Sequence, residues 1–135
     1  MSHDPIQLRA IATVESPLTD LASAPLQGHE GAPDAWLVFE PDVLEGLDGL
    51  RAGTEVIVLT WLHRSSRDVL RVHPRGDPAN PMQGVFSTRS PARPNPIGVH
   101  RVRILDIDGA RVRVSDLEAL DGTPVIDVKV ALDRS

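Results

Sequence analysis

The sequence predicts an all-β fold, a small β-barrel of about seven strands with long functional loops and at most one short helix. Strand signals are plentiful, because short segments rich in β-branched residues recur at close spacing and are bounded by turn residues. Helix signals are scarce, which favours a barrel or a sandwich over an alternating α/β layout. The length of 135 residues, with 41% apolar and 24% charged residues, predicts one globular domain over 1–135.

The predicted elements follow one another along the chain. A short helix is expected over 41–50, with Pro41 or Asp42 near its N-terminus and Gly49 after it. The tetrapeptide at 121–124, DGTP, is expected to form a turn that leads into the last strand. The strands are expected at 6–14, 35–40, 55–62, 68–73, 99–105, 110–116 and 124–130.

The hairpin near 106–110 can be predicted in more detail from side-chain alternation. A three-residue loop, Ile107–Asp108–Gly109, is expected because it places Ile104 opposite Val112 on the buried face. The same register places Arg103 opposite Arg113, and like charges so placed either point into water or pair with acids on a neighbouring strand, or else form a face that contacts phosphate. The residues expected on the buried face are Val102, Ile104, Val112 and Val114.

A long connection over 74–98 carries half of the 12 prolines. Loops of this length inside a compact domain are uncommon unless they are functional or disordered. The rigid prolines and the apolar anchors in this segment favour an ordered, functional loop. Asn95 stands between two prolines, so its amide is aimed in advance, either to brace the loop or to read the edge of a ligand.

The charge is distributed unevenly along the chain. The net charge of −5 argues against nucleic-acid binding, which usually goes with a basic balance. The segment from Arg64 to Arg103, however, holds eight arginines against Asp68 and Asp77, a net charge of +6. This asymmetry predicts a cationic face that meets an anionic partner, unless the charges interleave on the folded surface.

Several kinds of site and location are not indicated by the sequence. There is no cysteine, and the five histidines show neither HxH nor HxxxH spacing, so we expect no disulfide and no metal. The nucleophile motif GxSxG and the nucleotide-binding motif GxGxxG are both missing. No run of 18 apolar residues occurs and the N-terminus does not look like a signal peptide, so we expect a cytoplasmic protein without a membrane anchor.

A long and compositionally unusual motif occupies 84–98, GVFSTRSPARPNPIG. Three further segments accompany it in order, namely IATVESP (11–17), EVIVLTWLH (55–63) and LEALDGTPVIDVK (117–129). With these motifs the chain resembles, over almost its whole length, the TsaA-like family, which includes the TrmO-type tRNA N6-methyltransferases. The resemblance implies a small β-barrel that binds S-adenosylmethionine without a Rossmann fold. It also implies a homodimer with the cofactor site near the subunit interface.

The resemblance implies roles for individual residues. Arg89 can pair with the methionine carboxylate of the cofactor or with a substrate phosphate; we assign it the carboxylate and leave Arg93 for the substrate. His63 is either the general base, since imidazole suits proton transfer near neutral pH, or a strand-end residue that only touches adenine. The implied cofactor-binding residues are Pro25, Gln27, Gly28, His63, Arg64, Arg89, Val99, Ser115, Asp116, Leu117 and Glu118. The candidate catalytic residues are His63, Asn95 and Asp127, and the candidate substrate-binding residues are Arg93, Asn95, Arg101 and Arg103.

The implied activity is methylation of N6 of the threonylcarbamoyl adenosine at tRNA position 37. The chain departs from the family pattern at Leu26, where arginine is frequent, and at Arg64, where glutamine is seen. It also ends at Ser135, whereas longer members carry a further C-terminal domain.

One alternative is a methyltransferase with a small-molecule acceptor, which needs no phosphate contacts. Another is a non-catalytic module that binds S-adenosylmethionine or RNA, although 3% aromatic residues supply few stacking platforms.

Overall fold

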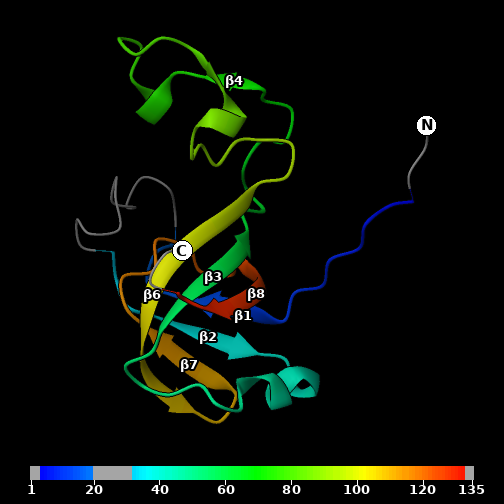
Figure 1. The fold of residues 1–135 in the computed structure, drawn as a ribbon, viewed down its shortest axis with the longest axis vertical. Helices are drawn as coiled ribbons and strands as arrows, with labels where there is room; N and C mark the ends of the chain where they lie inside the picture. Colours follow the sequence, from blue (N-terminus) through cyan, green and yellow to red (C-terminus); the bar gives the residue numbers. More distant parts are fainter. Residues whose placement is uncertain (1–3, 20–31, 133–135) are drawn as a thin grey trace.

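The structure, a computed structural model, describes residues 4–19 and 32–132. Within this part of the chain, six antiparallel strands pair in a closed ring in the order β1-β2-β7-β6-β3-β8 (Figure 1). The predicted all-β barrel is therefore confirmed, with six strands in the ring. These strands are β1 (Ala12–Glu15), β2 (Ala35–Phe39), β3 (Glu55–Trp61), β6 (Ile97–Asp108), β7 (Arg111–Val114) and β8 (Pro124–Val130).

The interior of the barrel is filled by every second residue of its strands. Side chains alternate across a strand, so Val56 and Val58 of β3 are buried while their neighbours are partly exposed. The predicted buried face of the β6–β7 hairpin is confirmed, because each of its four residues is at most 3% exposed. The core consists of Ala12, Val14, Ala35, Leu37, Phe39, Val56, Val58, Val102, Ile104, Val112, Val114, Leu117, Ala119 and Val125.

The register of the β6–β7 hairpin differs from the prediction. Asp108 pairs with Arg111, so the loop consists of Gly109–Ala110 rather than three residues, and Gly109 takes a φ of 60°. A bulge between Ile104 and Asp106 then shifts the register. The extra residue in the bulge restores the inward direction of the apolar side chains, which a two-residue loop alone would have turned outward.

The predicted opposition of Arg103 and Arg113 is wrong for the same reason. Arg113 faces Asp106 in the hairpin, and its guanidinium lies 3.9 Å from the carboxylate of Asp34. Arg103 faces Glu55 on the neighbouring strand β3. Both arginines therefore stand beside acids, which is the first of the two alternatives that the sequence left open.

The predicted helix is confirmed as the 3-10 helix η3 (Pro41–Leu47). Pro41 occupies the start of the helix, where the missing N–H costs nothing. Gly49, just beyond the helix, has a φ of 94°, which favours glycine. The predicted turn at 121–124 is also confirmed, since Gly122 has a φ of 84° and β8 begins at Pro124.

Two predicted strands are wrong in extent. The first begins only at Ala12, and in 68–73 only β4 (Arg71–Val72) is a strand. β4 does not join the barrel but pairs with β5 (Gln83–Gly84) in a separate two-stranded sheet. Proline cannot donate to a strand ladder, and Pro74 and Pro81 stand next to this pair, which keeps it short.

The segment 64–96, called the loop unit below, extends beyond the end of the barrel at which β3 stops and β6 starts (Figure 1). It contains β4, β5 and the single 3-10 turns η4 (Pro74–Gly76) and η5 (Val85–Ser87). Its return to the barrel is fixed by two backbone hydrogen bonds, from Arg93 N to Ser66 O at 3.1 Å and from Leu62 N to Pro96 O at 2.7 Å. The proline-rich connection thus adopts a defined structure against the barrel.

Candidate functional site

A cavity of about 1200 Å³ lies where the loop unit meets the end of the barrel. Its walls come from segments far apart in the sequence: Leu18, the residues 62–65 after β3, the stretch 86–93, the start of β6 at 97–100, and 118–123. Pockets that hold drug-sized ligands measure roughly 300–1,000 Å³, so this cavity has room for a ligand of that size. Six predicted site residues line it: His63, Arg64, Arg89, Arg93, Val99 and Glu118.

The two arginines of the proline-rich motif, Arg89 and Arg93, differ in their hydrogen bonds to the rest of the cavity wall. Arg93 donates from Nε to Ser90 O at 2.8 Å and from Nη2 to Val85 O and Thr88 O, both at 2.7 Å. Arg89 is exposed to the cavity, and no described residue forms a hydrogen bond or ion pair with it. Arg93 therefore braces the loop, whereas the guanidinium of Arg89 is available for an anion.

His63 and Arg64 reach the cavity because they directly follow β3. The strand ends at Trp61, and a tight turn with a hydrogen bond from His63 N to Trp61 O at 2.8 Å carries the chain into the cavity wall. Both side chains are exposed, and Arg64 Nη1 donates to Thr19 O at 3.4 Å. Their arrangement suits contact with a ligand that enters from the side of the loop unit.

Asn95 is held by its neighbours, as its position between two prolines predicts, but it does not line the cavity. Its Oδ1 accepts a hydrogen bond at 3.1 Å from Arg67, which also donates to Pro94 O at 2.8 Å. The guanidinium of Arg67 lies 5.0 Å from the ring centre of Trp61. Of the two roles that the sequence left open for Asn95, the contacts support bracing of the loop.

Asp127 lies away from the cavity that His63 lines. It lines a smaller pocket of about 230 Å³ between η3 and β8, together with Phe39 and Val43. One of its carboxylate oxygens pairs with Lys129 Nζ at 3.0 Å, and the other accepts from Val128 N at 2.9 Å. These contacts give Asp127 a local partner on its own strand.

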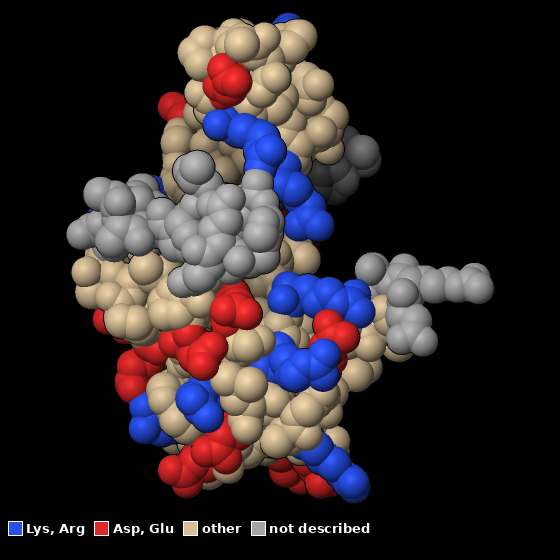
Figure 2. All heavy atoms as spheres, turned by 90° about the vertical axis from the view of Figure 1, so that its left-hand side faces the viewer, with Lys and Arg blue, Asp and Glu red and all other residues tan. Residues whose placement is uncertain are grey.

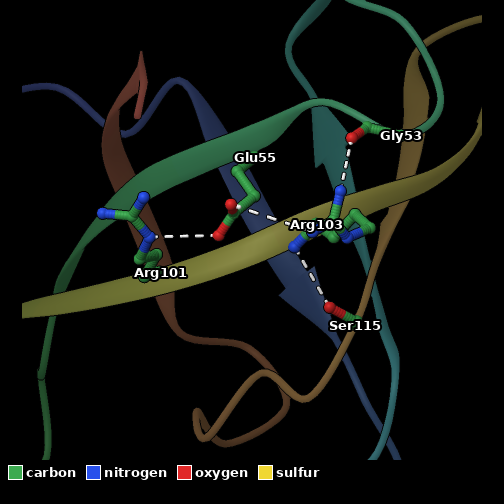
Figure 3. Close-up of polar contacts among 5 residues, drawn as sticks. All are labelled: Gly53, Glu55, Arg101, Arg103 and Ser115. Carbon is green, nitrogen blue, oxygen red and sulfur yellow. Dashed lines mark hydrogen bonds and ion pairs between the residues drawn. The ribbon is translucent and has the colours of Figure 1, made fainter. Parts of the chain in front are cut away.

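Arg101 and Arg103 lie on the outer face of β6, outside the cavity lining, on either side of Glu55 (Figure 3). Arg101 Nε donates to Glu55 Oε2 at 3.0 Å, and Arg103 Nη2 lies 3.7 Å from Glu55 Oε1. Arg103 also donates through Nη1 to Gly53 O at 2.7 Å. Glu55 thus neutralises part of the charge of this pair.

The segment 115–118 lies beside the cavity, but only Glu118 lines it. Ser115 Oγ accepts a hydrogen bond from Arg103 N at 3.0 Å (Figure 3). Asp116 has a φ of 46°, and Leu117 is fully buried in the core. The predicted residues Pro25, Gln27 and Gly28 lie outside the described part of the chain.

The sequence analysis did not identify a polar pair next to the cavity, Thr60 and His100. Thr60 Oγ1 lies 2.9 Å from His100 Nε2, and the side chain of Thr60 is fully buried. Burial and, to a lesser degree, the charge of Arg89 lower the pKa of His100 from 6.5 to about 4. Strand alternation contained the signal, because a buried Val102 implies that His100 points inward as well.

Residues 4–19 and 32–132 contain neither a candidate metal site nor a candidate membrane-spanning helix. No group of three or more histidine, aspartate or glutamate side chains there could hold a metal ion. Among the same residues, no helix has the length and apolar character that crossing a membrane requires.

Comparison with known proteins shows a consistent set of relatives. Residues 13–134 match the family model described as the tRNA-methyltransferase O N-terminal domain. A "probable S-adenosyl-L-methionine-binding protein" of Methanothermobacter thermautotrophicus is 44% identical over 129 residues, which cover 96% of this chain and 92% of the relative. An "S-adenosyl-L-methionine-binding protein" of Archaeoglobus fulgidus is 42% identical over 122 residues, covering 90% of this chain and 86% of the relative.

The fold is also similar to solved structures. A crystal structure of TrmO from Pseudomonas aeruginosa matches with a TM-score of 0.75 at 28% sequence identity. The match covers 99% of this chain but 58% of that one. The present chain therefore spans somewhat more than half the length of the TrmO chain that it resembles.

Proposed function

This chain belongs to the family of the tRNA-methyltransferase O N-terminal domain, and on that premise we propose that it is an S-adenosylmethionine-dependent methyltransferase. Its proposed substrate is the threonylcarbamoyl adenosine at tRNA position 37, which would be methylated at N6. The observation that carries the proposal is the cavity beside the proline-rich motif, with Arg89 in its wall, whose guanidinium has no hydrogen-bond or ion-pair partner among the described residues. We propose the cytoplasm as the site of the reaction, because this substrate is a tRNA.

The residues of the cavity fit S-adenosylmethionine. The free guanidinium of Arg89 can bind the methionine carboxylate in bidentate fashion. Phe86, 80% exposed at the cavity, offers an aromatic face to a nucleobase, and Leu62, Ile97 and Val99 supply apolar wall. When bound, this cofactor supplies an electrophilic methyl group on its sulfonium.

The protein contributes positioning to such a transfer. Methyl transfer requires alignment of the reacting atoms, and rigid loops hold them with little further loss of entropy. Arg93 ties the carbonyls of Val85, Thr88 and Ser90 together, so the loop that carries Arg89 is stiff before a ligand arrives. His63 is the residue we propose to accept the proton from the acceptor nitrogen.

The contact with tRNA is proposed for the loop unit. In Figure 2 a band of basic side chains runs from the upper part of the molecule to its junction with the barrel, whereas over the barrel basic and acidic side chains lie side by side. Arg71 and Arg75 of the loop unit are exposed, and their side chains pair with no described residue. Arginines without a partner among the described residues suit RNA phosphates, whereas Arg101 and Arg103 share Glu55.

A homodimer is proposed through the outer face of β3 and β6. Val99 pairs with Leu59 across these strands, and Ile97 pairs with Trp61. Val99 is 46% and Ile97 37% exposed, and both also line the cavity. A second copy of the chain that covered this apolar face would close one side of the cavity. Leu59→Glu should then halve the mass measured by light scattering, and an unchanged mass would contradict this interface.

Two experiments test the proposed function. Calorimetry should detect binding of S-adenosylmethionine to the folded protein. The absence of binding would reject a methyltransferase of either kind, whether its acceptor is tRNA or a small molecule. Mass spectrometry of tRNA nucleosides should show loss of methylated threonylcarbamoyl adenosine when the gene is deleted. An unchanged level would reject the tRNA substrate and leave a small-molecule acceptor.

A further inference from the structure

A largely buried polar cluster next to the cavity has no role in the function proposed above. It consists of Thr60 on β3 and of Gly98 and His100 on β6. Thr60 and Gly98 are direct cross-strand partners, and His100 lies two residues along β6 on the same inward face. The ring of His100 reaches back to Thr60, with 2.9 Å between Nε2 and Oγ1.

Glycine at position 98 makes room for this hydrogen bond. A Cβ atom built there would lie 2.4 Å from Thr60 Oγ1 and 2.7 Å from His100 Nε2. Such distances are far inside van der Waals contact, so any larger residue would push the two groups apart. The glycine that closes the proline-rich motif is therefore matched to the Thr60–His100 pair.

The hydrogen bond determines which ring nitrogen of His100 carries the proton. The fully buried hydroxyl of Thr60 has one hydrogen to donate, and among the described residues its partner is His100 Nε2. A buried hydroxyl hydrogen without an acceptor costs stability, so Thr60 donates and Nε2 accepts. A neutral imidazole that accepts at Nε2 carries its hydrogen on Nδ1.

The surroundings keep His100 in this neutral form. Burial and the nearby charge of Arg89 lower its pKa to about 4. His100 lines the cavity, and its Nδ1 forms no hydrogen bond with a described residue. Leu18, Ala119 and Leu120, each less than 10% exposed, line the cavity with it. An N–H donor between apolar side chains suits a flat heterocycle with an uncharged acceptor.

We propose that His100 recognises the nucleoside part of the bound ligand by donating Nδ1–H to an uncharged ring nitrogen or ribose oxygen. Thr60 is its positioning residue, because it fixes the tautomer. The charged end of the same ligand goes to Arg89. This inference rests on the proposed function for the identity of the ligand, S-adenosylmethionine, but the tautomer can be tested without it.

The tautomer can be measured in the free protein. Nitrogen-15 NMR of the histidine rings at neutral pH should show a protonated Nδ1 and an unprotonated Nε2 for His100. Thr60→Val, which removes the hydroxyl at nearly constant volume, should abolish this preference, and Thr60→Ser should retain it. A protonated Nε2 in the wild-type protein would overturn the proposal.

The ligand contact is tested by binding of S-adenosylhomocysteine to two matched variants. His100→Asn keeps an amide near the position of Nδ1, whereas His100→Gln keeps one near Nε2. Because a neutral hydrogen bond is at stake, His100→Gln should weaken binding about three- to tenfold, and His100→Asn should weaken it less. Equal affinities of wild type and His100→Gln would overturn the contact. If the wild type itself does not bind, the proposed cofactor and this contact both fail, while the NMR result still decides the tautomer.

Discussion

Protonation of His100 should destabilise the protein as the pH falls. The unfolded chain takes up this proton near pH 6.5, whereas the folded protein takes it up only near pH 4. The contribution of His100 is therefore fully present above about pH 6.5 and is lost progressively toward pH 4. At about 1.4 kcal/mol for each pH unit, the whole window corresponds to roughly 3 kcal/mol.

The cause of this loss is local. Protonation would place a charge in a buried site beside the guanidinium of Arg89 and would set an Nε2 hydrogen against the hydroxyl of Thr60. His63, Arg64 and Glu118 are further ionisable side chains in the cavity wall. A neutral variant in place of His100 separates its proton from theirs, because all other groups stay the same.

The assay is urea denaturation of the wild type and of His100→Gln between about pH 7 and about pH 4.5. The glutamine can still accept a hydrogen bond from Thr60 but cannot take up a proton in this range. The wild type should lose roughly 2 to 3 kcal/mol relative to the variant across the range. A difference in unfolding free energy that does not change with pH would mean that folding does not lower the pKa of His100.

Three further substitutions test the cavity and its surroundings. Arg89→Ala should weaken binding of S-adenosylmethionine about 10- to 100-fold in calorimetry, because a charge-assisted pair is lost; an affinity within twofold of wild type would remove Arg89 from the site. Gly98→Ala should lower the unfolding free energy by about 2–3 kcal/mol in urea, since its Cβ collides with Thr60 and His100, and a loss under about 0.5 kcal/mol would contradict that clash. Arg71→Glu should weaken tRNA binding and reduce its salt dependence. The control is Arg51, an exposed arginine ahead of β3 at the other end of the barrel. Arg51→Glu should leave both the affinity and its salt dependence unchanged.

Much of the barrel could be predicted because side-chain alternation is a local property of a strand. The apolar positions of β3, β6 and β7 identified the buried face before any pairing was known. The hairpin register was not predictable in this way, because the bulge after Ile104 and the loop at Gly109 compensate each other. Two arrangements with different registers bury the same side chains, so the pattern alone does not choose between them.

The strand predicted at 68–73 was misplaced for a different reason. Val69, Leu70 and Val72 have the composition of a barrel strand, but the neighbouring prolines limit the pairing to a short ribbon outside the barrel. Leu70 remains 62% exposed there. Strand propensity is a property of the segment itself. Whether the segment joins the barrel depends on which other strands it can pair with.

The candidate site was predicted in part. The motif residues Arg89 and Arg93 both reach the cavity, but sequence could not show that Arg93 binds three carbonyls while Arg89 has no partner within residues 4–19 and 32–132. Those contacts depend on how η5 turns, which is a tertiary feature. His100 was overlooked because a lone histidine on an apolar face usually belongs to the core, although it followed the same alternation as Val102.

The central claim is that the cavity holds S-adenosylmethionine and that the chain transfers its methyl group to tRNA. The most direct measurement incubates the protein with tRNA that contains threonylcarbamoyl adenosine and with cofactor that carries a deuterated methyl group, followed by mass spectrometry of the nucleosides. The label should appear on threonylcarbamoyl adenosine, and Arg89→Ala should reduce it. Unlabelled nucleoside in the presence of folded protein that binds the cofactor would contradict the central claim.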